Sequence, residues 1–158
     1  MFRELGRKKQ QLSMEECVKL LREEKRGVLS VLGDEGYPYG TPMNHWYDEK
    51  DGCIWFHCGK QGHRLDALKN CDKVSFCVYD RGYREEGDWA LNVKSVVVFG
   101  RMEVVDDLAT IVDVTTKLSY KFTQDDTYIQ REIRESARGT LLLRLRPEHI
   151  CGKQVTES

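Results

Sequence analysis

The chain has 158 residues, 40% of them hydrophobic, and a formal net charge of −1, values that suit one soluble domain with a buried core. A charge this close to zero argues against a general nucleic-acid binder, and no apolar run approaches membrane-spanning length. The first residues are basic but lack the apolar segment of a secretory signal, so a cytoplasmic location is expected.

A helix is the first predicted element. Residues 13–27 begin with Ser13 and Glu16 at capping-box spacing, carry an apolar stripe, and reach Gly27, which can end a helix. Apolar periodicity and turn residues predict six strands, at 27–33, 39–48, 53–58, 72–80, 95–105 and 139–152. Further helices are predicted at 62–70 and, as two helices separated near Thr123, within 107–138.

Six evenly spaced strands, mostly joined as hairpins, indicate a mainly β fold with flanking helices, in which residues 1–158 form a single domain. We expect a small closed or nearly closed antiparallel barrel, whose first three strands form a meander. The run "SVVVFG" at 95–100 is almost continuously apolar, which predicts that both of its faces are covered. A partner subunit could cover the second face.

The stretch "GKQGHR", residues 59–64, lies where a strand gives way to a helix. Its glycines allow backbone N–H groups to approach an anion, and a helix N-terminus adds unpaired donors. Arg64 supplies a fork of donors that suits a phosphate, and Lys60 and His63 can add charge. Basic residues are unfavourable in the first turn of a helix unless an anion is nearby. The stretch is either a phosphate site or a solvated loop with two turn glycines.

Other site chemistries find less support. The chain has six cysteines but no C-x-x-C pair, which favours reduced cysteines packed as small apolar residues. Strand alternation places Cys53 and His57 on one face and Cys58 on the other, so a zinc site is not expected. No nucleophile elbow or cysteine-protease signature is present. The tryptophans and Tyr47 could line a pocket for a planar ligand or belong to the core or a dimer interface.

Several segments, taken in order, carry a family resemblance: "GVLSVLGDEGYPYGTPMNHWYD", "IWFHCGKQGHRLDALKNCDKVSFCVYD", "KSVVVFGRMEVVDD" and "PEHICGK". With them, the chain resembles the flavin-binding split barrels of the pyridoxamine 5′-phosphate oxidase-like superfamily. It is most similar to the Nim branch, the 5-nitroimidazole reductase or resistance proteins. The oxidase itself has an arginine–lysine pair where this chain has His63 and Arg64 after a shorter loop, so its substrate site is not carried over.

The resemblance implies that FMN is bound at the interface of a homodimer. The backbone of the second strand would pass the isoalloxazine ring, the following segment would hold the phosphate, and the long apolar strand would face the flavin, often across the dimer. The matching positions are Thr41, Pro42, Met43 and Asn44 for the ring, His57, Cys58, Lys60, Gly62, His63 and Arg64 for the phosphate, and Ser95 and Val97 on the long strand.

The function expected from this resemblance is transfer of electrons from FMN to a small electron-poor aromatic such as a 5-nitroimidazole. His57 is the candidate catalytic residue and His63 a second one, as proton donors; either could instead make a phosphate or structural hydrogen bond. No nicotinamide-binding motif is present, so NADH, NADPH or a redox protein would bind transiently. The alternatives are a flavin or haem carrier, with His57, His63 or His149 as haem ligand, and a barrel that has lost its cofactor.

Overall fold

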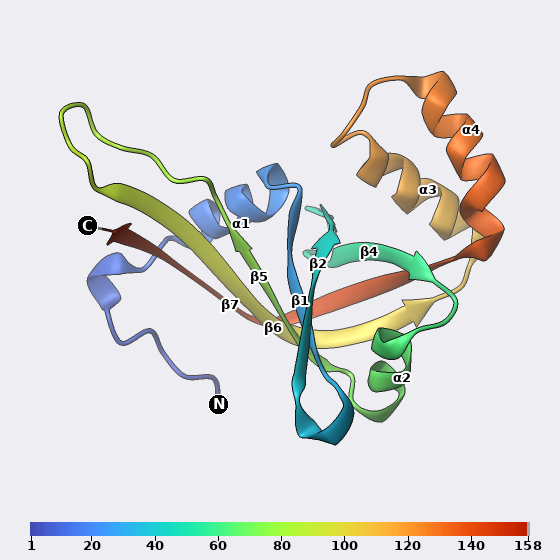
Figure 1. Ribbon diagram of the computed structural model, residues 1–158, viewed down its shortest axis with the longest axis horizontal. Coiled ribbons are helices and arrows are strands. Elements are labelled where there is room, and N and C mark those ends of the chain that lie inside the picture. Colours follow the sequence, from blue (N-terminus) through green and yellow to red (C-terminus); the bar gives the residue numbers. More distant parts are fainter. Residues whose placement is uncertain (158) are drawn as a thin grey trace.

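The computed structural model describes residues 1–157, which form one curled antiparallel sheet of seven strands with four α-helices around it (Figure 1). The strands are β1 (Arg26–Leu32), β2 (Pro38–Asn44), β3 (Trp46–Tyr47), β4 (Ile54–Gly59), β5 (Lys73–Tyr79), β6 (Leu91–Val105) and β7 (Thr140–Glu157), in the order β2-β1-β5-β6-β7-β4-β3. The helices are α1 (Met14–Glu23), α2 (His63–Asn70), α3 (Leu108–Ser119) and α4 (Asp126–Ser136). The mainly β fold of a split barrel is confirmed, with seven strands in place of six.

The first helix begins as the sequence predicts. The Ser13 side chain accepts a hydrogen bond from the Glu16 N–H, and the Glu16 carboxylate accepts one from the Ser13 N–H at 3.0 Å. The predicted end at Gly27 is wrong, because α1 ends at Glu23 and Gly27 lies within β1. A Cβ at Gly27 would collide with the Cys77 carbonyl oxygen on β5. The glycine therefore allows β1 and β5 to approach closely.

The predicted strand at 39–48 breaks at His45, which accounts for the seventh strand. Its first part, β2, pairs with β1, whereas its second part, β3, pairs with β4. The predicted antiparallel meander of the first three strands is confirmed in its pairings, but its middle strand is bent at His45, so that each part pairs with a different neighbour. The side chain of His45 is fully buried. Because β2 and β3 are the two ends of the sheet, the chain crosses the open side of the barrel at this residue.

Two apolar clusters hold the sheet in place. The larger lies inside the curl, where Leu21 of α1 packs with Phe56 and Phe76. The smaller lies outside β4 and β7, where α3 and α4 cover Trp55 and Leu142. Successive residues of β4 thus belong to different clusters, as strand alternation requires. The two helices predicted within 107–138 are confirmed, with the break at 120–125.

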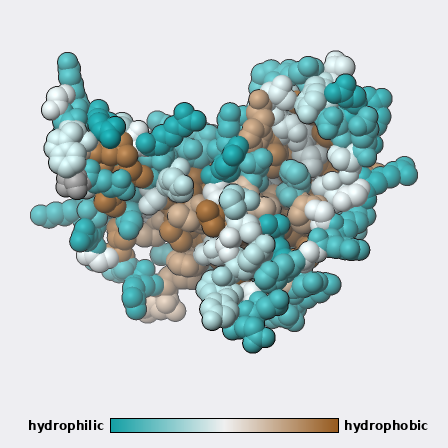
Figure 2. All heavy atoms as spheres, in the orientation of Figure 1, coloured by the Kyte–Doolittle hydropathy of each residue, from teal (hydrophilic) through white to brown (hydrophobic). Residues whose placement is uncertain are grey.

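Part of the outer sheet surface has no helix over it. The sheet register places Pro42, Val28, Cys77, Val97 and Cys151 in one row across β2, β1, β5, β6 and β7. We call this row the open face, and each of its side chains is exposed or half-buried. Figure 2, which has the orientation of Figure 1, shows hydrophobic atoms at the surface in the middle of the molecule, among hydrophilic ones. Within residues 1–157, no helix has the length and apolar character needed to cross a membrane.

Candidate functional site

The junction of β4 and α2 is shaped by glycine. Gly62 is the N-cap of α2 and has φ +142°, a conformation that side-chain-bearing residues rarely adopt. Among residues 1–157, no side chain caps this helix, so the N–H groups of its first turn keep their hydrogen-bonding capacity for another acceptor. A Cβ built on Gly59 or Gly62 would meet no atom within 4 Å. The start of α2 therefore borders open space and carries partial positive charge.

Arg64 joins this helix to the edge of the sheet. Its Nη2 donates a hydrogen bond to Thr41 Oγ1 at 2.6 Å. Thr41 belongs to β2, an end strand that pairs with β1 alone, and α2 follows β4 near the other end. The hydrogen bond thus spans the gap at which the barrel is split. It orients a guanidinium whose other N–H groups can bind an anion.

His63 packs beside Arg64 against the β1–β2 turn. Its ring stacks on Tyr39, with a distance of 4.1 Å between ring centroids. Its Nε2 lies 3.6 Å from Asp34 Oδ2, and this buried nitrogen has no hydrogen-bond partner within residues 1–157. The imidazole is therefore held by stacking. Sequence reasoning missed Tyr39, although strand alternation places it on the same face of β2 as Thr41.

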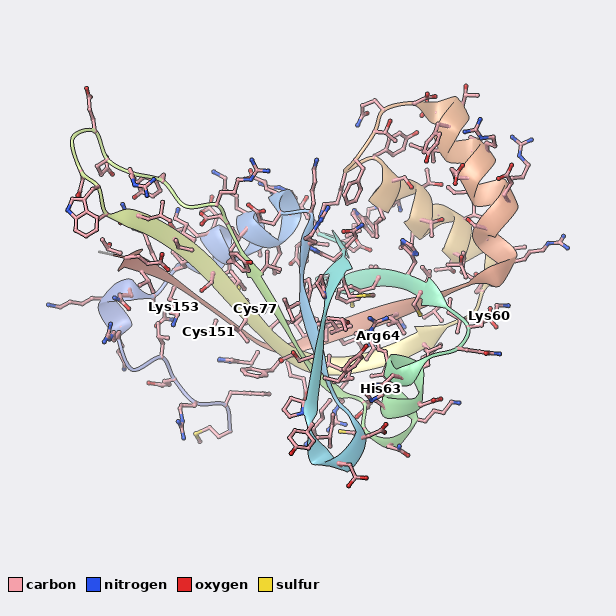
Figure 3. The ribbon with its side chains drawn as sticks, in the orientation of Figure 1. Lys60, His63, Arg64, Cys77, Cys151 and Lys153 are labelled. Carbon is pink, nitrogen blue, oxygen red and sulfur yellow. The ribbon has the colours of Figure 1, made fainter. Side chains whose placement is uncertain are left out.

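These residues surround a cavity of about 190 Å³. Four predicted phosphate-site residues line it, together with Tyr39 and the glycine loop: Cys58, Gly62, His63 and Arg64. We call Gly59–Arg64 and Thr41 the cradle; Figure 3 labels Lys60, His63 and Arg64 at this junction. Burial raises the pKa of the Cys58 thiol while nearby Arg64 lowers it, and the net direction is upward. A thiol whose pKa is raised carries little thiolate at neutral pH, which disfavours a nucleophilic role for Cys58.

The other predicted residues of the phosphate site and the ring site do not line the cavity of the cradle. His57 is on the opposite face of β4 from Cys58; its side chain is exposed, and partial desolvation lowers the pKa of its imidazole. Its proposed catalytic role stays a prediction. On β2, Met43 packs toward the core, whereas Pro42 and Asn44 point to the outer surface. Lys60 is exposed in the loop between β4 and α2.

The two predicted residues on the long strand lie apart from the cradle. Ser95 and Val97 are on β6, which β1 and β5 separate from β2. They line a different cavity, of about 360 Å³, between β6, the end of β7 and the N-terminal residues Arg3–Gly6. Figure 3 shows this separation, because Cys77, Cys151 and Lys153 lie beside β6, away from His63 and Arg64. One chain therefore does not bring all the predicted cofactor residues together.

Comparisons with known proteins agree with this architecture. Residues 13–154 match the family model described as pyridoxamine 5′-phosphate oxidase. No curated protein matches the chain. A solved structure from Bacteroides thetaiotaomicron, provisionally named a 5-nitroimidazole antibiotic resistance protein, is 15% identical with a TM-score of 0.77, covering 92% of this chain and 87% of its own.

Two further solved structures are similar. A protein from Mesorhizobium loti named FAD-binding is 23% identical, with a TM-score of 0.65 and coverage of 92% of this chain and 96% of its own. A Mycobacterium smegmatis protein named FAD and heme binding is 21% identical, with a TM-score of 0.70 and coverage of 94% and 74%. At these identities the similarity shows a shared fold. Because the family model spans most of the sequence, the chain belongs to the pyridoxamine 5′-phosphate oxidase family and has its split-barrel fold.

Proposed function

We propose that the chain is a flavin-dependent oxidoreductase that holds the phosphate of FMN, or of the FMN unit of a larger flavin, in the cradle. The observation that carries this proposal is the Arg64–Thr41 hydrogen bond beside the uncapped start of α2. An oriented guanidinium and free helix N–H groups together form a site for a dianion. The names of the FAD-binding neighbours support a flavin as the molecule that carries this phosphate.

The residues present fit such a ligand. A cavity of about 190 Å³ suits a phosphate and the start of a ribityl chain, so the ring would lie outside it. On the edge of β2 that faces away from β1, the register leaves the Pro42 carbonyl and the Asn44 N–H and carbonyl without a partner strand, and such main-chain groups can hydrogen-bond the pyrimidine part of a flavin. A bound flavin would supply the electron transfer, and the chain would bind and orient it.

A homodimer would complete the site. Ser95 and Val97 face outward on β6, beyond reach of the cradle of their own chain. Two copies packed through the open face would bring these residues of one copy toward the flavin of the other. The row from exposed Val28 to half-buried Cys77, Val97 and Cys151 gives such an interface its hydrophobic centre. A partner subunit would also cover the second face of the apolar strand β6.

The proposed substrate is a small, planar, electron-poor aromatic such as a 5-nitroimidazole. The neighbour named for 5-nitroimidazole resistance supports this choice. Its reductant, NADH, NADPH or a redox protein, would bind transiently. The alternative is a carrier that holds flavin without turnover. An activity assay distinguishes the two: the purified protein is mixed with NADH or NADPH and a nitroimidazole, and only an enzyme causes loss of nicotinamide absorbance.

The binding experiment is replacement of Arg64 by alanine. Loss of a charged hydrogen-bond donor predicts about 10- to 100-fold weaker flavin binding, measured by titration of flavin-free protein. Arg134→Ala, on the exposed surface of α4, is the matched control and should bind flavin normally. If Arg64→Ala protein retains flavin as well as the control, the phosphate is not held in the cradle.

A further inference from the structure

The cavity of about 360 Å³ on the outer surface of β6 and the last part of β7 has a graded floor. This floor consists of three cross-strand pairs, whose side chains share one face because strand residues two apart point the same way. The pairs are Phe99 with His149, Val97 with Cys151, and Ser95 with Lys153. The floor is therefore aromatic at one end and apolar in the middle. At the other end it offers a hydroxyl and an ammonium group.

The first residues of the chain form a wall of this cavity. Arg3–Gly6 line it, and the residue before them, Phe2, stacks on the His149 ring with 4.9 Å between ring centroids and 6° between the ring planes. After the wall, the Leu12 N–H donates a hydrogen bond to the Gly152 carbonyl oxygen at 2.9 Å. The segment is thus attached to β7 both before and after the wall, so a single chain holds the wall over the sheet.

The lining of this cavity carries more positive than negative charge. Arg3 and Lys153 supply a guanidinium and an ammonium group, and both residues are exposed. Glu4, the one carboxylate in the lining within residues 1–157, lies 3.2 Å from Lys8 Nζ. Burial raises the pKa of the Cys77 thiol, and the nearby Lys153 ammonium opposes this rise, which places the ammonium over the sheet face. An anionic group at the Lys153 end of the floor would therefore be stabilised.

We infer that this cavity binds a small planar aromatic carboxylate, with its ring on Val97 and its carboxylate at Ser95 and Lys153. The apolar middle of the floor accepts the ring, while the hydroxyl and the ammonium group donate hydrogen bonds to the acid. Successive pairs on one face of a strand are about 7 Å apart. A ring with one acid group spans this distance, so the carboxylate reaches the polar pair when the ring lies over the middle pair.

This inference rests on the proposed function where it concerns the substrate, and it narrows the substrate class to electron-poor aromatics that carry an acidic group. In the proposed homodimer, Ser95 and Val97 of one copy meet the flavin of the other, so a ring on Val97 would lie against that flavin. Binding to the cavity itself needs no flavin, because its floor and its wall come from one chain.

The test compares binding of para-nitrobenzoate and of its neutral analogue para-nitrobenzamide to the purified protein by isothermal titration. We expect the acid to bind at least about 10-fold more tightly, because only the acid has a charged group for Lys153. Lys153→Gln should remove this advantage and leave binding of the amide unchanged, whereas Lys153→Arg should retain the advantage. Lys50→Gln, which replaces an exposed lysine in the β3–β4 turn outside the cavity, is the matched control and should change neither affinity.

The same variant tests the substrate class during turnover with NADH or NADPH. In Lys153→Gln, kcat/KM for para-nitrobenzoate should fall about 10-fold, while the value for para-nitrobenzamide stays the same. Equal affinities for the acid and the amide in the unaltered protein, or equal effects of Lys153→Gln and Lys50→Gln, would overturn the inference.

Flavin binding separates this inference from the proposed function. If flavin binding depended on Arg64 but the acid did not bind, the proposed function would stand and the inference would fail. If the acid bound through Lys153 but no flavin bound, the cavity assignment would hold, and the proposed function would fail together with the substrate class.

Discussion

His45 shows how one residue determines where the chain changes direction. Its ring is fully buried, and Nε2 lies 2.7 Å from the Leu21 carbonyl oxygen, as expected for a donor N–H. Burial, aided by the nearby Lys121 ammonium, lowers the pKa of the imidazole to about 3. Lys121 donates to the carbonyls of His45 and Glu24. The neutral imidazole therefore belongs to the folded structure.

The depressed pKa of His45 predicts acid sensitivity. A base with a folded pKa of about 3 and an ordinary value of 6.5 stabilises the fold fully above pH 6.5, and this stability is lost as the pH falls toward 3. Between pH 7 and pH 5 the free energy of unfolding should fall by about 2 kcal/mol from this group. Urea unfolding across this range measures the change. In His45→Gln, which keeps a donor but does not titrate, the slope should be smaller; equal slopes would contradict the assignment.

At the scale of elements, close contact between β1 and β5 depends on Gly27. The glycine pairs with Met43 on β2 and lies against the Cys77 carbonyl oxygen and the Phe76 ring. The contact places the predicted helix terminator in the middle of the sheet. A pairing between distant segments has thus decided the role of a residue that local sequence assigns to a helix end.

Gly27→Ala should therefore destabilise the protein. The added methyl group would force β1 away from β5, at a cost of about 3 kcal/mol in the free energy of unfolding. Gly139→Ala is the matched control, because a Cβ there meets nothing within 4 Å, and it should change stability by less than about 1 kcal/mol. Chemical denaturation of both variants gives the comparison. Similar stabilities would show that the sheet accommodates the methyl group.

At the scale of the whole molecule, α3 and α4 cover one part of the outer surface of the sheet and leave another part without a helix. The uncovered part is the open face, where Val28, Val97 and the half-buried cysteines lie in register. The cradle and the cavity that Ser95 and Val97 line lie at different places on the molecule. A two-fold partner would bring these two places together.

The proposed dimer predicts that a charge on the open face separates the subunits. Val28→Glu would place a carboxylate in the apolar centre of the interface, where it would lose hydration. Light scattering after size-exclusion chromatography should give a dimer for the unaltered protein and a monomer for the variant, with reduced flavin content. Val112→Glu, which changes an exposed valine on α3, should remain dimeric. A monomeric unaltered protein, or a dimeric Val28→Glu variant, would exclude this interface.

Local sequence determined much of the fold. The capping box at Ser13 and Glu16, the two helices after residue 107, and most strand positions depend on contacts within a few residues, so periodicity and turn chemistry reveal them. The junction at Gly59–Arg64 was also predicted, because glycine and basic residues at a strand–helix boundary have a local signature. The lengths of the long strands were underestimated: β6 begins at Leu91 and β7 extends to Glu157.

Only the tertiary structure decided which distant segments meet. It separated β2 from β3 at His45, paired β4 with β7, and stacked Tyr39 on His63. It also joined Arg64 to Thr41 while leaving Ser95 and Val97 on another part of the sheet. Strand pairing and barrel curvature depend on packing between residues far apart in the chain, and a local sequence pattern does not identify those partners.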